Sequence, residues 1–195
     1  MFSSKSFYTV AVAAVALAIP VLGDRNFRVI NNCPEGINIF VNGITLGSLS
    51  ANGGSGVVSE PDDFSGVFYT NANGGNQNGF NTLRAGFEGN GDYYFLVVDN
   101  NHFNTEISIR PERPEFFGQF CQTIDCGGIG CEEAFTSFPL YFPPPSNFAP
   151  TPPLYTCPPY PNGSGNGYII TFCPNGNFPV PPFPPVLGTG DKGGT

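Results

Sequence analysis

Short runs of alternating apolar and polar residues fill the chain from residue 27 to residue 109. Apolar side chains at every second position predict β-strands with one buried face. In one such run, Ile37, Ile39 and Val41 alternate with Asn38, Phe40 and Asn42. The run 93–98 is apolar at every position, which is typical of a strand that is covered on both faces. These patterns predict an all-β fold.

Turn-forming residues separate the predicted strands. Asn42-Gly43 predicts a type I′ hairpin, because both positions tolerate positive φ, and the chain then returns through 44–49. Further clusters of Asn, Asp and Gly are found at 52–54, 71–79, 88–92 and 99–102. No stretch after the first 23 residues offers ten residues of helical periodicity without Gly or Pro. Many short strands with frequent turns predict a β-sandwich or a β-barrel.

The remaining parts of the chain have a different composition. Residues 1–23 combine a basic residue, an apolar run and a final glycine, the pattern of a secretory signal peptide. Residues 111–159 are rich in proline, which cannot donate a hydrogen bond within a sheet, so we predict loops that wrap the surface. Residues 175–195 are Pro- and Gly-rich and are predicted to be a disordered tail. A single β domain over 24–174 remains.

Charge narrows the class of partner. The 195 residues include 15 acidic and 7 basic ones, a formal net charge of −8. Such an acidic chain does not hold nucleic acid or an anionic membrane by charge. An uncharged extracellular polysaccharide or an extracellular protein fits better. We expect a monomer that is secreted to the extracellular space or the cell wall.

The cysteines agree with secretion. An even number in a chain predicted to be exported favours three disulfides, although spacing alone leaves their pairing open. The six are Cys33, Cys121, Cys126, Cys131, Cys157 and Cys173. No Cys-x2-Cys spacing is present and His102 is the single histidine, so we expect neither a zinc site nor a cofactor. One sequon, Asn162-Gly163-Ser164, predicts a glycan on Asn162.

Three groups of segments resemble fungal thaumatin-like proteins. They are Val29-Ile30-Asn31-Asn32-Cys33-Pro34 with the glycine-rich 53–56; 81–87 with Tyr93-Tyr94 and His102-Phe103-Asn104; and 155–158 with 168–174. The resemblance covers residues 26–174 and implies a flattened β-sandwich, in a small variant without the family's cysteine-rich second domain. It also implies three disulfides, Cys33–Cys173, Cys121–Cys157 and Cys126–Cys131.

The resemblance also points to an acidic cleft. Many thaumatin-like proteins have one Arg, one Glu and two Asp there, associated with binding or weak hydrolysis of β-1,3-glucan. The matching positions in this chain are Val67, Gly86, Leu96 and Asn101, so all four charges are missing. Non-catalytic binding of cell-wall β-glucan or another extracellular glycan is therefore the leading hypothesis, and no catalytic residue is predicted.

Other residues near these positions are candidates for ligand binding, namely Glu88, Asp99 and Tyr93. Asp92 and Asp99 bracket one predicted strand and are about 23 Å apart at ~3.3 Å per residue. Glycoside hydrolysis needs two carboxyl groups within roughly 5–9.5 Å, so this pair is unsuitable. A carboxylate pair formed by Glu88 with Asp99 or Glu106 across neighbouring strands is an alternative that the sequence leaves open. The alternatives are a weak endo-β-1,3-glucanase and a protein-binding role, as a hydrolase inhibitor, surface antigen or effector.

Overall fold

The structure, a computed structural model, describes residues 24–99, 103–112, 121–128, 130–144, 151–157 and 166–179. Several predictions concern residues outside these ranges. They include the signal peptide over 1–23, the glycosylation site Asn162, the cleft position Asn101, His102 and the tail from residue 180 onward.

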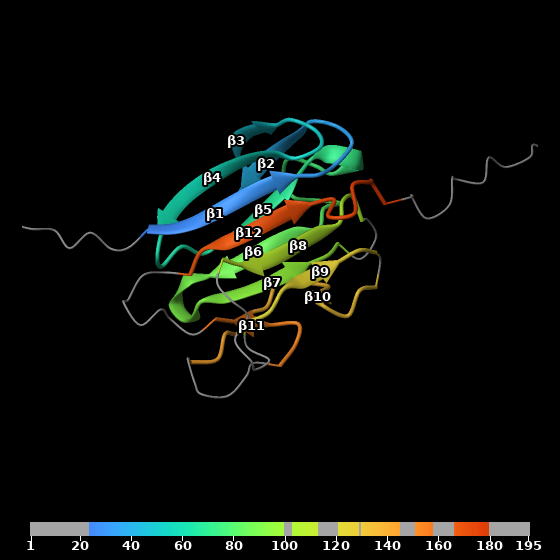
Figure 1. Cartoon of the computed structure of the whole chain (residues 1–195). Helices are drawn as coiled ribbons and strands as arrows, with labels where there is room; N and C mark the ends of the chain where they lie inside the picture. Colours follow the sequence, from blue (N-terminus) through green and yellow to red (C-terminus); the bar gives the residue numbers. More distant parts are fainter. Residues whose placement is uncertain are drawn as a thin grey trace, which may run out of the picture.

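Strands of the described residues form two sheets that pack face to face (Figure 1). The five-stranded sheet has the order β4-β1-β12-β8-β9 and contains β1 (Asp24–Asn31), β4 (Gly54–Pro61), β8 (Ile107–Pro111), β9 (Ile124–Cys126) and β12 (Tyr168–Phe172). The seven-stranded sheet contains β2 (Ile37–Val41), β3 (Ile44–Leu49), β5 (Gly66–Thr70), β6 (Arg84–Glu88), β7 (Tyr93–Val97), β10 (Ala134–Phe135) and β11 (Tyr155–Thr156). Its order is β10-β7-β6-β5-β2-β3, with β11 also paired to β7. The predicted all-β sandwich is confirmed.

The first and last strands are neighbours inside the five-stranded sheet. β1 and β12 run parallel, with Phe27 opposite Tyr168, and β4 and β8 pair with them in antiparallel orientation. Just beyond the two strands, Cys33 and Cys173 form a disulfide with Cα atoms 4.9 Å apart. It joins residues 140 positions apart, and in the chain-entropy model a loop of this length contributes about 5 kcal/mol.

The other two disulfides lie in the part of the chain that follows β8. Cys121 pairs with Cys157 and Cys126 with Cys131, so all six cysteines form the pairs that the resemblance implies. Cys126 ends β9, and Cys157 directly follows β11. These bonds attach the proline-rich region to both sheets, because β9 belongs to one sheet and β11 to the other.

Aromatic side chains fill the space between the sheets. Phe27 from β1 and Tyr168 from β12 meet Phe68 from β5 and Phe87 from β6, and all four are at most 2% exposed. The ring centroids of Phe27 and Phe87 are 4.7 Å apart, and those of Phe87 and Tyr168 are 5.0 Å apart. Such ring pairs contribute about 0.5–1.5 kcal/mol beyond the burial of their area. This cluster holds the two sheets together.

Features that depend on a single strand or turn were predicted correctly from the sequence. Asn42 and Gly43 have φ of 49° and 85°, and they join β2 to β3 as the predicted hairpin. All five residues of β7 are buried, as the apolar run indicated. Phe40 departs from the predicted alternation, because its outward-facing ring is only 2% exposed and stacks on Tyr69 with centroids 5.5 Å apart.

The folded part extends past the predicted boundary at residue 174. The side chain of Asn175 donates a hydrogen bond of 2.6 Å to the Glu106 carboxylate, and Phe178 packs against the core. Residues 175–179 therefore belong to the domain and not to the predicted tail. No helix in the described ranges is long and apolar enough to cross a membrane.

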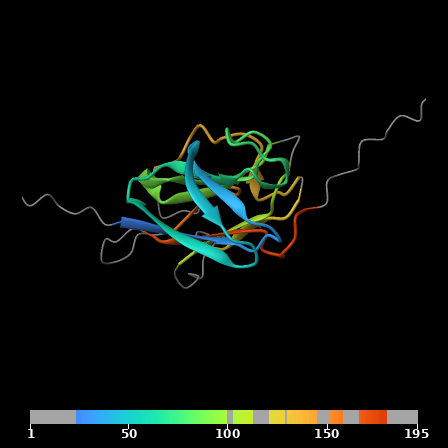
Figure 2. The same ribbon diagram turned by 90° about the horizontal axis from the view of Figure 1, so that it is seen from above.

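A third layer covers the outer face of the seven-stranded sheet (Figure 2). It comes from the proline-rich region, whose strands β10 and β11 pair with β7, and its main part is the segment 135–144, which we call the strap. A second apolar cluster forms between sheet and layer, with Tyr93, Phe95 and Val97 below and Leu154, Phe135 and Phe142 above. The strap thus wraps the surface as predicted for this region, whereas β9, β10 and β11 of the same region are short strands paired into the sheets.

Candidate functional site

A shallow pocket of about 270 Å³ lies where the strap meets the outer face of the seven-stranded sheet. Both the sheet and the strap contribute to its walls. Its lining consists of Asn42, Ser65, Gly66, Val67, Phe87, Glu88, Phe95, Phe138, Pro139 and Phe142. This volume is slightly below the usual range of ligand pockets, about 300–1,000 Å³, and suits a single ring-sized group.

Three strands build the floor of the pocket. Val67 of β5 is opposite Gly86 of β6, which is opposite Phe95 of β7. The Phe95 ring lies over Gly86, where an added Cβ would be 2.3 Å from the ring. The missing side chain of Gly86 therefore makes room for the Phe95 ring over β6.

Polar groups at the rim come from turns, Asn42 from the β2–β3 hairpin and Ser65 from the turn before β5. The Asn42 side-chain oxygen accepts a hydrogen bond of 2.9 Å from the Val67 amide, and the Ser65 hydroxyl accepts one of 3.2 Å from the Gly89 amide. Glu88 is the last residue of β6 and is partly exposed. Its carboxylate accepts only a long bond of 3.3 Å from the Asn90 side chain within the described residues, so it remains available to a ligand.

The strap forms the upper wall and is fixed at several points. The Tyr93 hydroxyl donates a hydrogen bond of 2.6 Å to the carbonyl of Pro143. Phe142 packs on Tyr93 and Phe95, with both centroid distances 5.7 Å. The Arg84 guanidinium lies 4.5 Å from the centroid of the Phe138 ring, a cation–π contact.

The predicted binding residues are only partly brought together. Glu88, the last residue of β6, and Tyr93, the first residue of β7, are cross-strand partners beside the pocket. Glu88 lines the pocket, whereas Tyr93 is 3% exposed and supports the strap from below. Asp99 lies at the opposite end of β7, where its carboxylate accepts a hydrogen bond from the Asn81 amide. Asp99 therefore belongs to a different part of the surface, about 20 Å along the strand at ~3.3 Å per residue.

The positions matched to the acidic cleft do not form one site. Val67 and Gly86 are neighbours on the outer face, and Val67 lines the pocket. Leu96 is fully buried in the core between the sheets, because it faces the opposite side of β7 from Phe95. A charged side chain at position 96 would enter the core and not the pocket.

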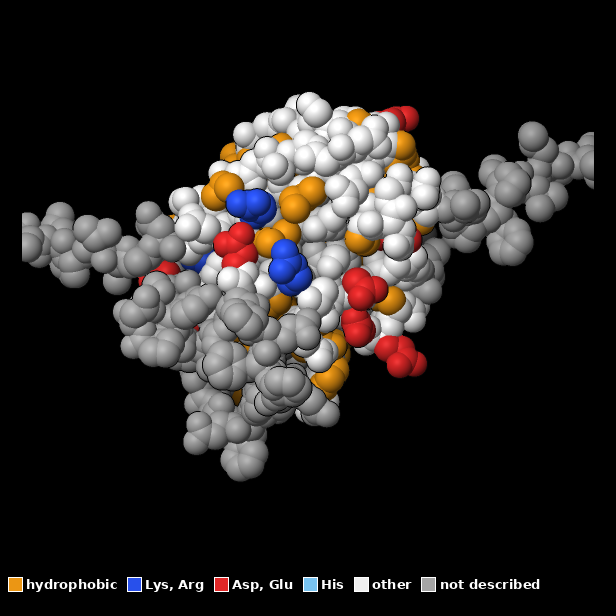
Figure 3. Space-filling model, in the orientation of Figure 1, with side chains coloured by type: hydrophobic (Ala, Val, Ile, Leu, Met, Phe, Trp, Pro, Cys, Tyr) orange, Lys and Arg blue, Asp and Glu red, His pale blue; other side chains and the backbone are white. Residues whose placement is uncertain are grey.

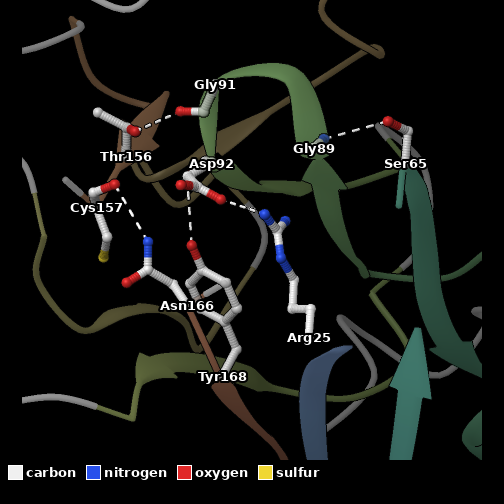
Figure 4. A network of polar contacts seen from close by, with 9 residues as sticks. All are labelled: Arg25, Ser65, Gly89, Gly91, Asp92, Thr156, Cys157, Asn166 and Tyr168. Carbon is white, nitrogen blue, oxygen red and sulfur yellow. Dashed lines mark hydrogen bonds and ion pairs between the residues drawn. The ribbon is translucent and has the colours of Figure 1, made fainter. Parts of the chain in front are cut away.

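A second polar site was missed by the sequence reasoning. Arg25, which is 1% exposed, forms an ion pair with Asp92, and the Tyr168 hydroxyl donates a hydrogen bond of 3.3 Å to the Asp92 carbonyl (Figure 4). The sequence contained a signal for this site. Arg25, Phe27 and Val29 are every second residue of β1, so Arg25 shares the inward face of the two apolar residues. This pair links the five-stranded sheet to the turn between β6 and β7, so the Asp92 carboxylate is engaged inside the fold.

Burial changes the proton affinity of groups around the strap. Desolvation raises the pKa of the Tyr93 and Tyr69 phenols above their ordinary value of 10.0. Desolvation also lowers the pKa of the Arg84 guanidinium, and the negative charge of Asp99 acts in the opposite direction. In the described ranges, no three His, Cys, Asp or Glu side chains gather closely enough to hold a metal ion.

Comparisons with known proteins do not assign the chain to a family. No protein-family model matches the chain, and no curated protein matches it either. The resemblance to thaumatin-like proteins therefore stands on the chain's own residues.

Proposed function

We propose that the protein is a secreted, non-catalytic glycan-binding protein whose binding site is the pocket beneath the strap. The observation that carries the proposal is the pocket's composition: the rings of Phe95, Phe138 and Phe142 surround it, and the Glu88 carboxylate lines its rim. Sugar rings present an apolar face and a periphery of hydroxyl groups. Aromatic walls with a hydrogen-bond acceptor at the edge match both features.

The opening of the pocket also favours a polymer over a small free ligand. The pocket is shallow, and the exposed Tyr141 and Leu140 of the strap lie close in sequence to its lining residues. An open pocket of this kind allows a chain of sugar units to continue along the surface beyond the unit that is held. Cell-wall β-glucan or another extracellular glycan is the ligand class that this arrangement supports.

Hydrolysis has less support than binding. Glu88 is the one carboxylate that lines the pocket, whereas the usual glycosidase mechanism employs two carboxyl groups about 5–9.5 Å apart. The Asp92 carboxylate is paired with Arg25, and Asp99 lies at the far end of β7. Glu106 immediately precedes β8 of the other sheet. A weak endo-β-1,3-glucanase therefore has no second described carboxylate at the pocket.

Membership of the thaumatin-like family is part of the same proposal. A flattened sandwich with its first and last cysteines joined is what the resemblance implies, and the chain has a two-sheet fold with Cys33 bonded to Cys173. The fold alone is a weak guide to function, so the pocket and not the family carries the argument.

Pull-down on insoluble β-glucan, chitin and mannan, with a laminarin hydrolysis assay alongside, tests the proposal. We expect retention on at least one glycan and no release of reducing ends. Phe142→Ala removes an aromatic wall and should abolish retention, whereas Arg110→Gln, on the opposite sheet, should not. Absence of retention on every glycan, or equal retention of both variants, contradicts the proposed site.

A second candidate, protein binding, is favoured by exposed apolar side chains on the strap. Leu140 is 99% exposed, Tyr141 72% and Phe138 41%. Exposed apolar groups that are contiguous mark interaction surfaces. If Leu140→Ser abolishes capture of an extracellular protein and leaves glycan retention unchanged, the strap serves protein partners.

A further inference from the structure

The pocket has one charged lining group and no charged partner for it. Asn42 and Ser65 already bind the backbone amides of Val67 and Gly89, so their oxygens hold the turns in place. Glu88 carries the only formal charge of the lining, and its one hydrogen bond among the described residues is the long one from Asn90. A carboxylate in this position attracts a hydrogen-bond donor and, above all, a cation.

No described cation neutralises Glu88. Arg84 is the nearest basic residue on β6, and four residues at ~3.3 Å separate the two along the strand by about 13 Å. Arg84 interacts electrostatically with Asp99 and Tyr69, toward the other end of the strand. Arg28 and Arg110 lie on the five-stranded sheet. The Arg84 guanidinium lies against Phe138 on the strap's side of the pocket, but Glu88 is the only charged residue of the lining itself, in a protein with a net charge of −8.

The aromatic walls also favour a cation. A cationic group near the face of a Phe ring is attracted by the ring's quadrupole, and the attraction increases when water is excluded. Phe138 already makes this contact with the Arg84 guanidinium on the strap's side of the sheet. Phe95 and Phe142 line the pocket with Glu88 and make no cation–π contact within the described residues.

We propose that the pocket binds a protonated primary amine carried on a sugar ring, that is, a deacetylated amino-sugar unit of a polysaccharide. This inference rests on the proposed glycan binding and specifies its ligand. The ammonium group pairs with the Glu88 carboxylate while the ring packs on Phe95 and Phe142. An acetylated or unsubstituted sugar makes the same ring contact but lacks the ionic interaction.

Titration of the full chain with soluble oligosaccharides tests the inference, with binding followed by calorimetry and by NMR shifts. The three probes are glucosamine oligomers, N-acetylglucosamine oligomers and β-1,3-glucose oligomers of equal length. We expect glucosamine oligomers to bind about tenfold more tightly than the other two, because one ionic contact in a partly exposed site is of this size. The preference should shrink as salt is raised.

Glu88→Gln keeps the shape and removes the charge, so it should reduce glucosamine binding about tenfold and leave weak neutral-sugar binding unchanged. Glu112→Gln, at an acidic residue that directly follows β8 on the other sheet, is the matched control and should change neither. Near-UV circular dichroism checks that both variants fold. NMR shifts of the unsubstituted protein provide an independent readout and should map to the Phe95 and Phe142 rings.

Equal or tighter binding of N-acetylglucosamine or β-1,3-glucose oligomers overturns the inference and leaves the proposed glycan binding intact. Failure of all three probes overturns the inference, and the pull-down on β-glucan, chitin and mannan then decides separately whether the proposed glycan binding stands. If a lysine-containing peptide competes as well as the glucosamine oligomer does, the amine need not be on a sugar, and the inference is again overturned.

Discussion

The two outer faces of the sandwich differ in what covers them. On the five-stranded sheet, Arg28, Ile169 and Arg110 are direct cross-strand neighbours, and basic, acidic and apolar side chains are interspersed on an open surface (Figure 3). On the seven-stranded sheet, Phe95 and Val97 are at most 3% exposed beneath the strap. The five-stranded sheet is covered on one face, whereas the seven-stranded sheet is also covered on its outer face at β7.

This difference explains where the pocket arises. A sheet with two apolar faces needs cover on both sides, and the second cover here is irregular, proline-rich chain instead of another sheet. Irregular chain has no periodic surface that matches the pleat of a sheet. The strap therefore packs closely over Tyr93 and Phe95 and leaves space beside Val67 and Glu88.

Truncation of a covered ring should have the largest effect. Phe95→Ala removes a ring that is 3% exposed and packs against Phe135 and Phe142, so we expect a loss of about 3–5 kcal/mol in the free energy of unfolding. Ile169→Ala on the open face should cost only about 1 kcal/mol, because the side chain is half-buried. Urea unfolding with the disulfides intact measures both. Equal losses of unfolding free energy in the two variants would show that the strap does not stabilise the fold by covering Phe95.

Added volume beneath the strap should have the next largest effect. Gly86→Ala places a Cβ 2.3 Å from the Phe95 ring, and overpacking of this kind costs about 1–3 kcal/mol. The displaced ring should also reduce ligand binding. Gly128→Ala, where a Cβ meets nothing within 4 Å, is the matched control, and a similar loss there would contradict the steric explanation.

Removal of the hydroxyl that fixes the strap should have a smaller effect. Tyr93→Phe deletes the hydrogen bond to the Pro143 carbonyl and should cost about 1 kcal/mol at neutral pH. Because burial raises the pKa of Tyr93 in the folded state, its contribution is complete below the ordinary value of 10.0 and is lost as pH rises through the raised pKa. Unfolding measured from pH 8 to 11 should show a steeper alkaline loss for the unsubstituted protein than for the variant. The same slope in both proteins would contradict this role of Tyr93.

Charge removal on the open face should have the smallest effect. Arg28 is 55% exposed and its Nε lies 3.7 Å from the Glu112 carboxylate, a distance typical of a weak surface pair. Arg28→Gln should change the free energy of unfolding by less than about 0.5 kcal/mol. A larger change would mean that the Arg28–Glu112 pair stabilises the fold more than its exposure to solvent indicates.

Sequence patterns predicted the parts of the fold that depend on neighbouring residues. The hairpin at Asn42-Gly43 and the doubly covered strand 93–97 follow from turn chemistry and from apolar runs. What covers that strand did not follow, because the strap begins 38 residues after the strand ends and has no periodic pattern. β4 was also missed, since its first residues, Gly54-Ser55-Gly56, are typical of a turn.

The candidate site shows a further limit of sequence reasoning. Matching residues to a cleft places Leu96 beside Gly86, but side chains alternate across a strand, and Leu96 lies on the other face of the sheet. Glu88 was predicted as a binding residue and does line the pocket, whereas its aromatic partners on the strap, Phe138 and Phe142, were not predicted. They come close to Glu88 only because the chain folds back over β7.

The disulfide between the first and last strands has a mechanical consequence. Tension applied between residues 24 and 179 passes along β1 to Cys33, crosses the bond to Cys173 and leaves by the last few residues. While the bond is intact, the covalent path of the load bypasses the chain between the two cysteines. When it is reduced, the same tension reaches every strand, and complete extension lengthens the molecule by on the order of 480 Å. A single-molecule pull in oxidising and then reducing buffer should show this difference directly.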